Sequence, residues 1–278
     1  MCTINFKGKI IDLTSPIVMG ILNITPDSFF KGYLDYTHED ILGLARNMMI
    51  QGATILDIGG QSTRPGSIRV SAEEEIKRVI PVIETLHHHF PDVILSIDTY
   101  YSEVAGIAVQ SGVSIVNDIS AGELDNNMIS TVGHLNVPYI AMHMQGTPET
   151  MQQNPNYHHV VNEVIDYFIS KKQDCIQAGI KDIILDPGFG FGKTNEHNYT
   201  LLRELSALNI LDCPILAGVS RKGMIYKTLG VSASEALNGT TVANTMALMN
   251  GAKMLRVHDV KEAVEAITIF KAYKNAAL

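Results

Sequence analysis

The sequence predicts an α/β fold of the (β/α)₈ barrel type, because eight short apolar runs alternate with helical patterns along 278 residues. Most of these runs are continuously apolar, as expected for parallel strands that are buried on both faces. Several helical patterns end at a glycine or asparagine just before the next run, and these residues tolerate the left-handed conformation of a helix end. We therefore expect one barrel domain over residues 1–278, with its active site at the carboxyl ends of the strands.

The expected elements follow in order along the chain. Residues 3–11 are expected to form an N-terminal β-hairpin that turns at residues 7–9 and covers one end of the barrel. One helix is expected to begin at Thr37, and the next at Ser71, which forms a capping-box pattern with Glu74. The expected helix-ending residues are Gly52, Gly112, Asn136, Gly179 and Gly251. The expected strands are 17–22, 54–58, 93–97, 114–116, 139–142, 183–185, 214–217 and 253–257.

A doubly wound open sheet is the alternative α/β fold. The sequence lacks the glycine fingerprint that such sheets use to bind dinucleotides. Residues 188–194, GFGFGKT, resemble a phosphate-binding P-loop, but Pro187 occupies the position of the first glycine in that motif. The barrel is therefore the favoured fold.

Composition excludes several classes of function. A formal charge of −8 argues against general binding to nucleic acid or to an anionic membrane. No apolar run approaches the roughly 20 residues of a membrane span, and the N-terminus lacks the apolar core of a signal peptide. Cys2, Cys175 and Cys213 are scattered and form no CxxC pattern, which argues for a reducing compartment and against a cysteine zinc site. We expect a cytoplasmic protein.

Side chains typical of binding sites follow all eight expected strands. They are Asn23, then Ser62, Thr63 and Arg64, Asp98, Asn117 and Asp118, His143, Asp186, then Ser220, Arg221 and Lys222, and finally Arg256 with His258. Any one of them could simply end a strand or cap the next helix. Because the carboxyl ends of all strands meet at one face of a barrel, the complete set favours a common site.

These side chains suit two kinds of ligand group. The residues suited to phosphate oxygens or a metal are Asn23, Thr63, Arg256 and His258. They follow strands that adjoin when the barrel closes. Asp98, Asn117 and Asp186 suit a flat heterocycle with several N–H donors, because a carboxylate can accept two parallel hydrogen bonds. Lys222 could donate a hydrogen bond or form a Schiff base, and Arg221 beside it would disfavour its charged form.

The motifs occur together in a characteristic order. They are MGILNITPDSF (19–29), DIGGQSTRPG (57–66), Asp98, Asn117 with Asp118, DPGFGFGK (186–193), SRK (220–222) and RVH (256–258). Over nearly the whole chain this set resembles the dihydropteroate synthase family of pterin-binding barrels. The resemblance implies a transferase of folate biosynthesis that joins 6-hydroxymethyl-7,8-dihydropterin diphosphate to 4-aminobenzoate and releases diphosphate. It also implies Mg²⁺ as cofactor, a homodimer and a sulfonamide target.

The resemblance assigns roles to individual residues, and Asn23 matches the magnesium ligand. The implied diphosphate contacts are Asn23, Thr63, Arg256 and His258. The implied pterin contacts are Asp98, Asn117, Asp186, Lys222, Phe189 and Gly218. The residues implied for 4-aminobenzoate and the two closing loops are Phe29, Thr63, Arg64, Pro65, Ser220 and Gly223. The implied catalytic residues are Asp98, Lys222, Arg256 and His258.

Three positions depart from the family pattern. Lys31 stands where aspartate is usual, Gln61 where glutamate is frequent, and Gly223 where a side chain is common. Two other functions stay open beside the synthase. A methyltransferase acting from methyltetrahydrofolate to a cobalamin protein would share the pterin contacts but has no use for the 62–66 loop. A non-catalytic pterin-binding paralogue is kept open by Lys31 and Gln61.

Overall fold

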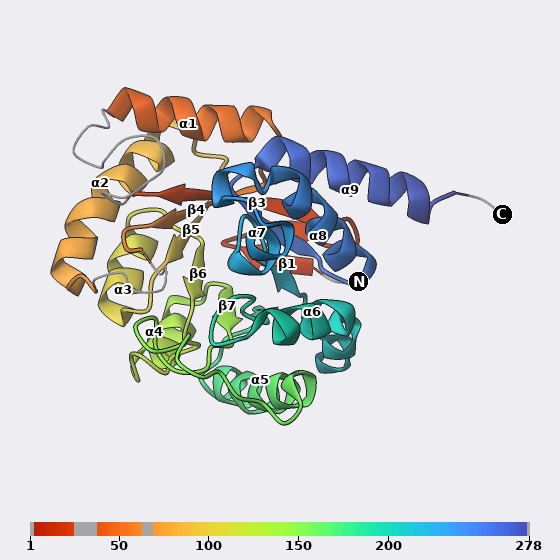
Figure 1. The fold of residues 1–278 in the computed structure, drawn as a ribbon. Helices are drawn as coiled ribbons and strands as arrows, with labels where there is room; N and C mark the ends of the chain where they lie inside the picture. The colour runs from red at the N-terminus through yellow and green to blue at the C-terminus, as the bar shows by residue number, and fades with distance from the viewer. Residues whose placement is uncertain (1–2, 25–37, 63–68, 277–278) are drawn as a thin grey trace.

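Eight parallel strands surrounded by helices form the body of the protein (Figure 1). The computed structural model describes residues 3–24, 38–62 and 69–276. In order around the sheet, the strands of this described part are β8 (Ile183–Asp186), β7 (Tyr139–Met142), β6 (Ile115–Asp118), β5 (Ile94–Asp98), β4 (Ile55–Gly59), β3 (Ile17–Asn23), β10 (Met254–Val257) and β9 (Leu216–Ala217). A bridge between Leu185 and Ile215 joins the two end strands and closes the barrel. The predicted barrel is confirmed.

In the described part of the chain, one α-helix follows each barrel strand except β9, which is followed by two. The helices are α1 (His38–Ile50), α2 (Ala72–His89), α3 (Ser102–Gln110), α4 (Met128–Leu135), α5 (Val160–Gln177), α6 (Asn195–Arg203), α7 (Gly223–Leu229), α8 (Leu237–Met249) and α9 (Val260–Lys274), with short 3-10 helices η2 (Leu205–Leu211) and η3 (Ala233–Glu235). All five predicted helix-ending residues have positive φ. The Ser71 side chain caps α2 by accepting from the Glu74 amide at 3.2 Å. Thr37 lies outside the described residues.

The barrel interior contains one apolar layer to which every strand contributes one residue. The layer consists of Met19, Ile55, Ile94, Ile115, Ile140, Ile184, Leu216 and Met254. The antiparallel hairpin β1 (Thr3–Phe6) and β2 (Lys9–Asp12) covers it from the amino-terminal end. Ile4 and Phe6 of β1, with Leu13, pack against this layer. The predicted hairpin is therefore present and seals the end of the barrel opposite to the strand carboxyl ends.

A polar layer lies directly above the apolar one. Alternate residues of a strand face the same side, so the residues two positions further along face the interior as well. They are Ile21, Asp57, Ser96, Asn117, Met142, Asp186, Gly218 and Arg256. The change from an apolar to a largely polar layer locates the candidate site inside the carboxyl-terminal mouth of the barrel.

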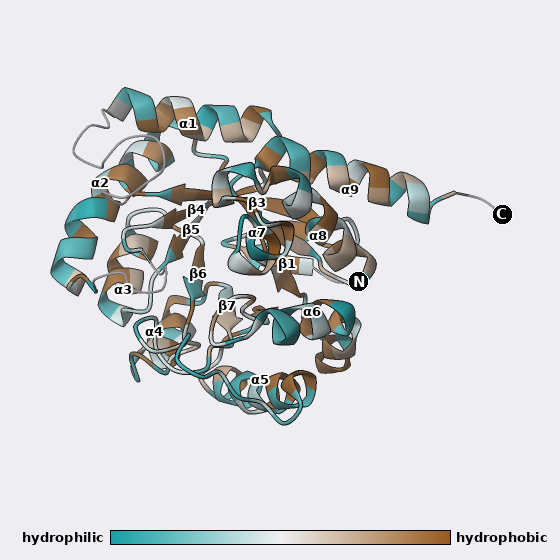
Figure 2. Ribbon diagram, viewed as in Figure 1, coloured by the Kyte–Doolittle hydropathy of each residue, from teal (hydrophilic) through white to brown (hydrophobic). Residues whose placement is uncertain are grey.

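The outer faces of the strands pack against the helices. Figure 2 shows apolar strands at the centre and helices with one apolar and one polar face. This pattern is expected for amphipathic helices that cover a parallel sheet. Among the residues that the structure describes, no helix is long and apolar enough to cross a membrane.

Candidate active site

Strand register brings four residues into one row at the mouth of the barrel. Asn23 pairs with Gly59, Gly59 with Asp98, and Asp98 with Asn117 across four neighbouring strands. The absence of a Cβ matters at Gly59, because one would lie 3.3 Å from the Asn23 amide oxygen. The row therefore places an amide, an open backbone position, a carboxylate and a second amide on four neighbouring strands, each about 4.8 Å from the next.

Arg256 connects two buried carboxylates across the barrel. Its Nε donates to Asp57 Oδ2 at 2.6 Å, and its Nη2 donates to Asp98 Oδ2 at 2.5 Å. Asn117 Nδ2 donates to the same Asp57 oxygen at 3.1 Å. Asp57 Oδ1 is buried and has no hydrogen-bond partner among the described residues. Asp57 was not among the residues singled out from the sequence, yet it orients both Arg256 and Asn117.

The barrel mouth favours uptake of a proton or a cation near Asp98. Burial raises the pKa of Asp98 to about 7, and the carboxylates of Asp57 and Asp186 add to the rise while Arg256 opposes it. Burial also raises the pKa of Asp186, although Lys222 opposes it. Carboxyl groups with displaced pKa values, clustered at one end of the barrel, are typical of active sites.

Lys222 and Asp186 face each other across the closing seam of the barrel. A Cβ on Gly218 would lie 3.7 Å both from Asp186 Oδ2 and from Lys222 Nζ, so the glycine leaves space between them. Burial lowers the pKa of Lys222 to about 8; Asp186 opposes this and Arg256 adds to it. The cation that lowers the pKa of Lys222 is therefore Arg256, whereas Arg221 was expected to do so. Arg221 instead makes a bidentate ion pair with Asp259, with both distances 2.8 Å.

Phe189 takes a different part from the one expected. Its side chain is fully buried in the outer core, and its carbonyl accepts from Lys222 Nζ at 2.5 Å. The aromatic ring beside Lys222 belongs to Phe191, with the ammonium 4.7 Å from its centroid. Phe191 packs with an apolar cluster at the mouth that includes Met142 and Met144. Of the two rings, that of Phe191 therefore lies beside Lys222 at the mouth, whereas that of Phe189 lies in the outer core.

Lys193 and His143 form a buried pair below this pocket. Lys193 Nζ lies 2.9 Å from His143 Nδ1 and donates to the carbonyls of Gly188 at 3.0 Å and Phe191 at 3.1 Å. Burial, and then the charge of Lys193, lower the pKa of His143 to about 2, so its ring is neutral and carries its proton on Nε2. Burial lowers the pKa of Lys193 to about 7, against the opposing effect of Asp186.

Ser220 and His258 meet where strands β9 and β10 end. The Ser220 hydroxyl lies 3.2 Å from His258 Nδ1 and accepts from the His258 amide at 3.3 Å. Gly223 begins α7, and a Cβ there would meet nothing closer than Tyr226 Oη at 3.6 Å. Packing therefore does not require glycine at this position.

Five of the residues named as site residues or as departures from the family pattern lie outside the described part of the chain. They are Phe29, Lys31, Thr63, Arg64 and Pro65. Gln61 is described and buried, and its Oε1 accepts from the Tyr100 hydroxyl and from the Val70 amide, both at 2.9 Å. The side chain at position 61 thus serves as a hydrogen-bond acceptor that connects the end of β4 to Val70 before α2 and to Tyr100, and the neutral amide of Gln61 is sufficient for this.

Asp118 has a structural role. Its carboxylate accepts from the amides of Ser120 and Gly122 and from the hydroxyls of Ser120 and Tyr139. The bonds from Ser120 and Gly122 shape the turn after β6, and the bond from Tyr139 ties that turn to β7. Asp118 therefore stabilises the scaffold, whereas its neighbour Asn117 faces the site.

The residues missed from the sequence are Asp57, Phe191 and Lys193. Asp57 lies inside an apolar strand, and a charged residue there is costly to bury unless it is paired. That position alone marks it as a residue with a partner inside the barrel. For Lys193 the sequence gives no comparable signal, because its partners come from the loop itself and from β7.

The predicted metal ligand, Asn23, lies in the row at the mouth. Within the described ranges, no group of three or more histidine, cysteine or acidic residues could hold a metal ion. Asn23 offers one amide oxygen close to the open backbone at Gly59. Mg²⁺ commonly takes one or two protein oxygens and completes its shell with substrate phosphates and water. The donor set therefore fits a magnesium ion that arrives with a phosphate-bearing substrate.

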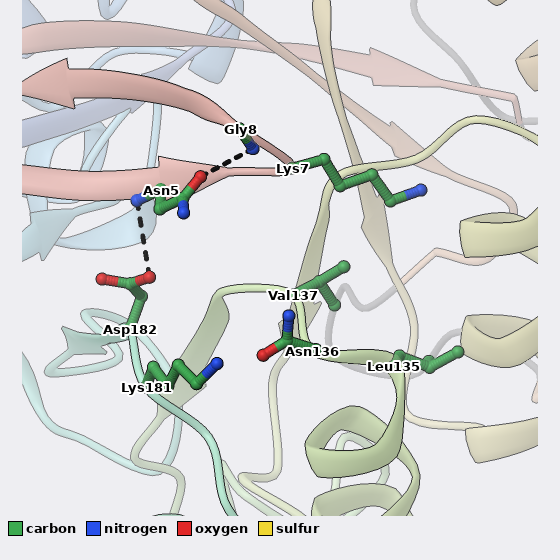
Figure 3. Close-up of a pocket in the computed structure, with 8 residues that line it drawn as sticks. All are labelled: Asn5, Lys7, Gly8, Leu135, Asn136, Val137, Lys181 and Asp182. Carbon is green, nitrogen blue, oxygen red and sulfur yellow. Dashed lines mark hydrogen bonds between the residues drawn. The ribbon is translucent and has the colours of Figure 1, made fainter.

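A pocket of about 260 Å³ lies at the opposite end of the barrel (Figure 3). It is lined by the hairpin and by the loops that precede β7 and β8. The Asn5 amide donates to Asp182 Oδ2 at 3.4 Å across it. This pocket is at the amino-terminal ends of the strands, where barrels carry no active site, and contains none of the candidate residues.

Comparison with known proteins places the chain among pterin enzymes. A family model described as pterin binding enzyme matches residues 19–258. Dihydropteroate synthase of Escherichia coli (strain K12) is 45% identical over 275 residues, covering 97% of this chain and 96% of the relative. The enzyme of Haemophilus influenzae is 41% identical over 97% of this chain and 98% of the relative.

Solved structures agree with these relatives. A crystal structure of Yersinia pestis dihydropteroate synthase with a sulfonamide drug complex has a TM-score of 0.94 at 41% identity, covering 99% of this chain and 100% of that one. Xanthomonas albilineans dihydropteroate synthase with 4-aminobenzoic acid has a TM-score of 0.92 at 39% identity, covering 99% of each chain.

Proposed function

The chain belongs to the pterin-binding enzyme family, as a relative of the dihydropteroate synthases, and from this premise we propose how its residues carry out that reaction. The reaction condenses 6-hydroxymethyl-7,8-dihydropterin diphosphate with 4-aminobenzoate to give 7,8-dihydropteroate and diphosphate. Residues 1–278 would act as one pterin-binding domain. The observation that carries the proposal is that Arg256, which suits a diphosphate, donates to Asp98, which suits a pterin, from a strand that pairs with the one ending at Asn23.

The pterin ring would bind against the polar layer of the barrel. Asp186 accepts hydrogen bonds from the amino-amidine edge of the ring, Asn117 supplies a further polar contact, and Lys222 donates to the ring carbonyl. Gly218 leaves the space between Asp186 and Lys222 that the flat ring needs. The Phe191 ring and the methionines near it form the apolar wall.

The carboxylates in the mouth would assist departure of the diphosphate. Positive charge develops on the exocyclic methylene as the C–O bond to diphosphate breaks, and the dihydropterin nitrogens spread that charge over the ring. The negative charge of Asp98, with Asp57 behind it, stabilises this state electrostatically. Because the ring itself carries the charge, no protein nucleophile is required, and Lys222 acts as a donor.

The leaving diphosphate would lie on the side of Arg256 and His258. Among the described residues, the hydrogen bonds of Arg256 use Nε and Nη2, which leaves Nη1 for a phosphate oxygen. Asn23 lies on the same side, and Thr63 completes the expected set. Mg²⁺ held by Asn23 and the diphosphate would neutralise part of the anion's charge.

The arylamine of 4-aminobenzoate would then attack the methylene carbon, and the new C–N bond replaces the C–O bond while the amine loses a proton. Its carboxylate would rest near Ser220 and Gly223 at the start of α7, with Phe29, Arg64 and Pro65 over it. A dihydropteroate synthase with 4-aminobenzoic acid and another with a sulfonamide drug complex, both similar in fold, support 4-aminobenzoate as the second substrate and a sulfonamide target.

One assay tests the proposal: release of diphosphate from the pterin diphosphate, measured with and without 4-aminobenzoate and with and without Mg²⁺. The expected result is release that depends on both. A methyltransferase would instead use methyltetrahydrofolate and would ignore 4-aminobenzoate. Tight pterin binding with no diphosphate release under any condition would favour the non-catalytic paralogue and refute the synthase.

We further propose a homodimer that associates through α8 and α9. Val242, Met246 and Met249 form an exposed apolar stripe along α8, and Ile269 and Tyr273 form another on α9. Exposed apolar stripes on neighbouring helices are typical of subunit interfaces. Sedimentation of Met246→Glu is expected to show monomers, whereas Ile50→Glu, on the exposed face of α1, leaves the dimer intact.

A cytoplasmic location is part of the same proposal, supported by Cys175, which forms no disulfide.

A further inference from the structure

The loop of residues 188–192 joins β8 to α6 and is held by side chains. Every one of its five carbonyl oxygens accepts a side-chain hydrogen bond. The donors are Lys193 to Gly188 and Phe191, Lys222 to Phe189, Gln152 to Gly190, and Tyr157 to Gly192. Gly188 has φ +68°, and a Cβ on it would lie 1.9 Å from the His143 carbonyl oxygen, so the loop presses directly against the end of β7. These contacts fix the path of the loop.

Lys193 is at the centre of this arrangement. An ammonium group has three N–H donors. Lys193 Nζ directs them to the carbonyls of Gly188 and Phe191 and to His143 Nδ1, at 3.0, 3.1 and 2.9 Å, with the His143 carbonyl as a longer fourth contact at 3.4 Å. The side chain is only 2% exposed, so its charge is separated from water and relies on these partners. Lys193 therefore ties both ends of the loop to β7.

The same loop presents two groups to Lys222. The Phe189 carbonyl accepts from Lys222 Nζ at 2.5 Å, and the Phe191 ring lies 4.7 Å from that ammonium. A shift of the loop would therefore move the acceptor and the aromatic wall that set the direction of Lys222. Lys222 in turn shares the space beside Gly218 with Asp186.

We propose that Lys193, oriented by His143, is a positioning residue of the pterin pocket that fixes the 188–192 loop and through it Lys222 and the Phe191 ring. The inference rests on the proposed pterin site. A purely structural lysine would stabilise the fold and would affect every ligand alike. A positioning lysine affects the pterin selectively, because the described hydrogen bonds of Arg256, on the diphosphate side, go to Asp57 and Asp98 on β4 and β5 and not to this loop.

The test compares two probes by calorimetry: 6-hydroxymethylpterin and inorganic diphosphate with Mg²⁺. For Lys193→Met we expect the pterin Kd to rise about ten-fold or more, as for loss of hydrogen bonds from a charged donor. The diphosphate Kd should change little. Lys172→Met is the matched control, because Lys172 donates to the Leu211 carbonyl at 2.6 Å far from the site. Equal weakening of both probes in Lys193→Met would overturn the inference.

A second pair of variants keeps the test decisive if Lys193→Met does not fold. Asparagine can place an acceptor oxygen where His143 Nδ1 lies, whereas leucine cannot. We expect His143→Asn to retain most of the pterin affinity that His143→Leu loses. Equal loss in both would assign the effect to ring packing and overturn the inference. Wild-type protein that binds no pterin would refute the proposed function itself, whereas normal pterin binding by Lys193→Met would refute only the role of Lys193.

Discussion

Asp57 and Arg256 form an ion pair inside the barrel, with 2.6 Å between Oδ2 and Nε. Asp57 is fully buried on β4, and Arg256 comes from β10, two strands away. The pair holds the guanidinium where its Nη2 also donates to Asp98. An arginine fixed in this way can meet an incoming phosphate without first losing its own side-chain freedom.

Asp57→Asn should lower both the stability of the protein and the kcat of the reaction. The substitution keeps the shape of the side chain but removes its negative charge. Arg256 then stays buried without that partner, which lowers the free energy of unfolding by roughly 3–5 kcal/mol. The remaining contact with Asp98 would reduce that loss. We expect kcat to fall by about a hundred-fold as Arg256 loses its alignment. Steady-state kinetics measures kcat, and urea unfolding measures the loss of stability. A normal kcat would show that Asp98 alone is enough to align Arg256.

Pterin affinity should depend on pH through Lys222. Burial lowers the pKa of its ammonium to about 8, so the group loses its proton, and with it the charged donor, as the pH rises through that value. We expect affinity for 6-hydroxymethylpterin to decline above about pH 8 in the wild type. Lys222→Met should bind more weakly throughout and should lack the decline. A parallel decline in both proteins would assign the titration to another group.

Stability should depend on pH through Glu75. Its carboxyl is fully buried on α2, and neither oxygen has a hydrogen-bond partner among the described residues. Burial and then Asp98 raise its pKa to about 8, with Thr99 offsetting part of the rise. Between about pH 4.5 and 8 the folded state therefore binds more protons than the unfolded state, so stability falls as pH rises through this window.

Glu75→Gln should remove this dependence. The neutral amide avoids the buried charge, so the variant should gain stability over the wild type at pH 8 and differ little at pH 5. Urea unfolding at both values measures the difference. Glu74→Gln is the control, because Glu74 lies on the same turn and pairs with Arg78 at the surface. An identical pH profile for Glu75→Gln and the wild type would contradict the assignment.

Gly188→Ala should be far more damaging than Gly179→Ala. Both glycines have positive φ, which costs an alanine roughly 1–2 kcal/mol. At Gly179 a Cβ would meet nothing within 4 Å, whereas at Gly188 it would lie 1.9 Å from the His143 carbonyl oxygen. We expect Gly188→Ala to cost the strain and a backbone shift, and to lose pterin affinity as well. Thermal unfolding of the two variants gives the comparison, and equal losses would place the loop away from β7.

The sequence carries most of the fold because its signals are local. Residues 93–97, for example, form a run that is apolar except for Ser96. Asn136 ends α4 with φ +51°, as predicted. The strand after η2 is an exception. It was expected at 214–217 and spans only Leu216–Ala217, since Pro214 has no N–H to donate and Ile215 forms a single bridge.

Site residues at strand ends could be named from the sequence, but their partners could not. Asp98 and Arg256 are 158 residues apart, and only barrel closure brings them together. Loop direction was a further limit. Whether Phe189 or Phe191 faces the pocket depends on the positive φ values of three glycines, which the letters GFGFG permit without specifying.

Among the described strands, β8 and β9 are the neighbouring pair of the barrel with the fewest paired residues. One bridge at Leu185 and a hydrogen bond from its amide to the Pro214 carbonyl hold the two strands together. Amide hydrogens along this join should exchange with solvent sooner than those of β3 and β4, where five residue pairs hold the strands. A bound pterin would contact Asp186 at the end of β8 and Lys222 after β9, so the substrate would connect the two strands where few hydrogen bonds do. Protection at this join would then report occupancy of the barrel directly, without any measurement of turnover.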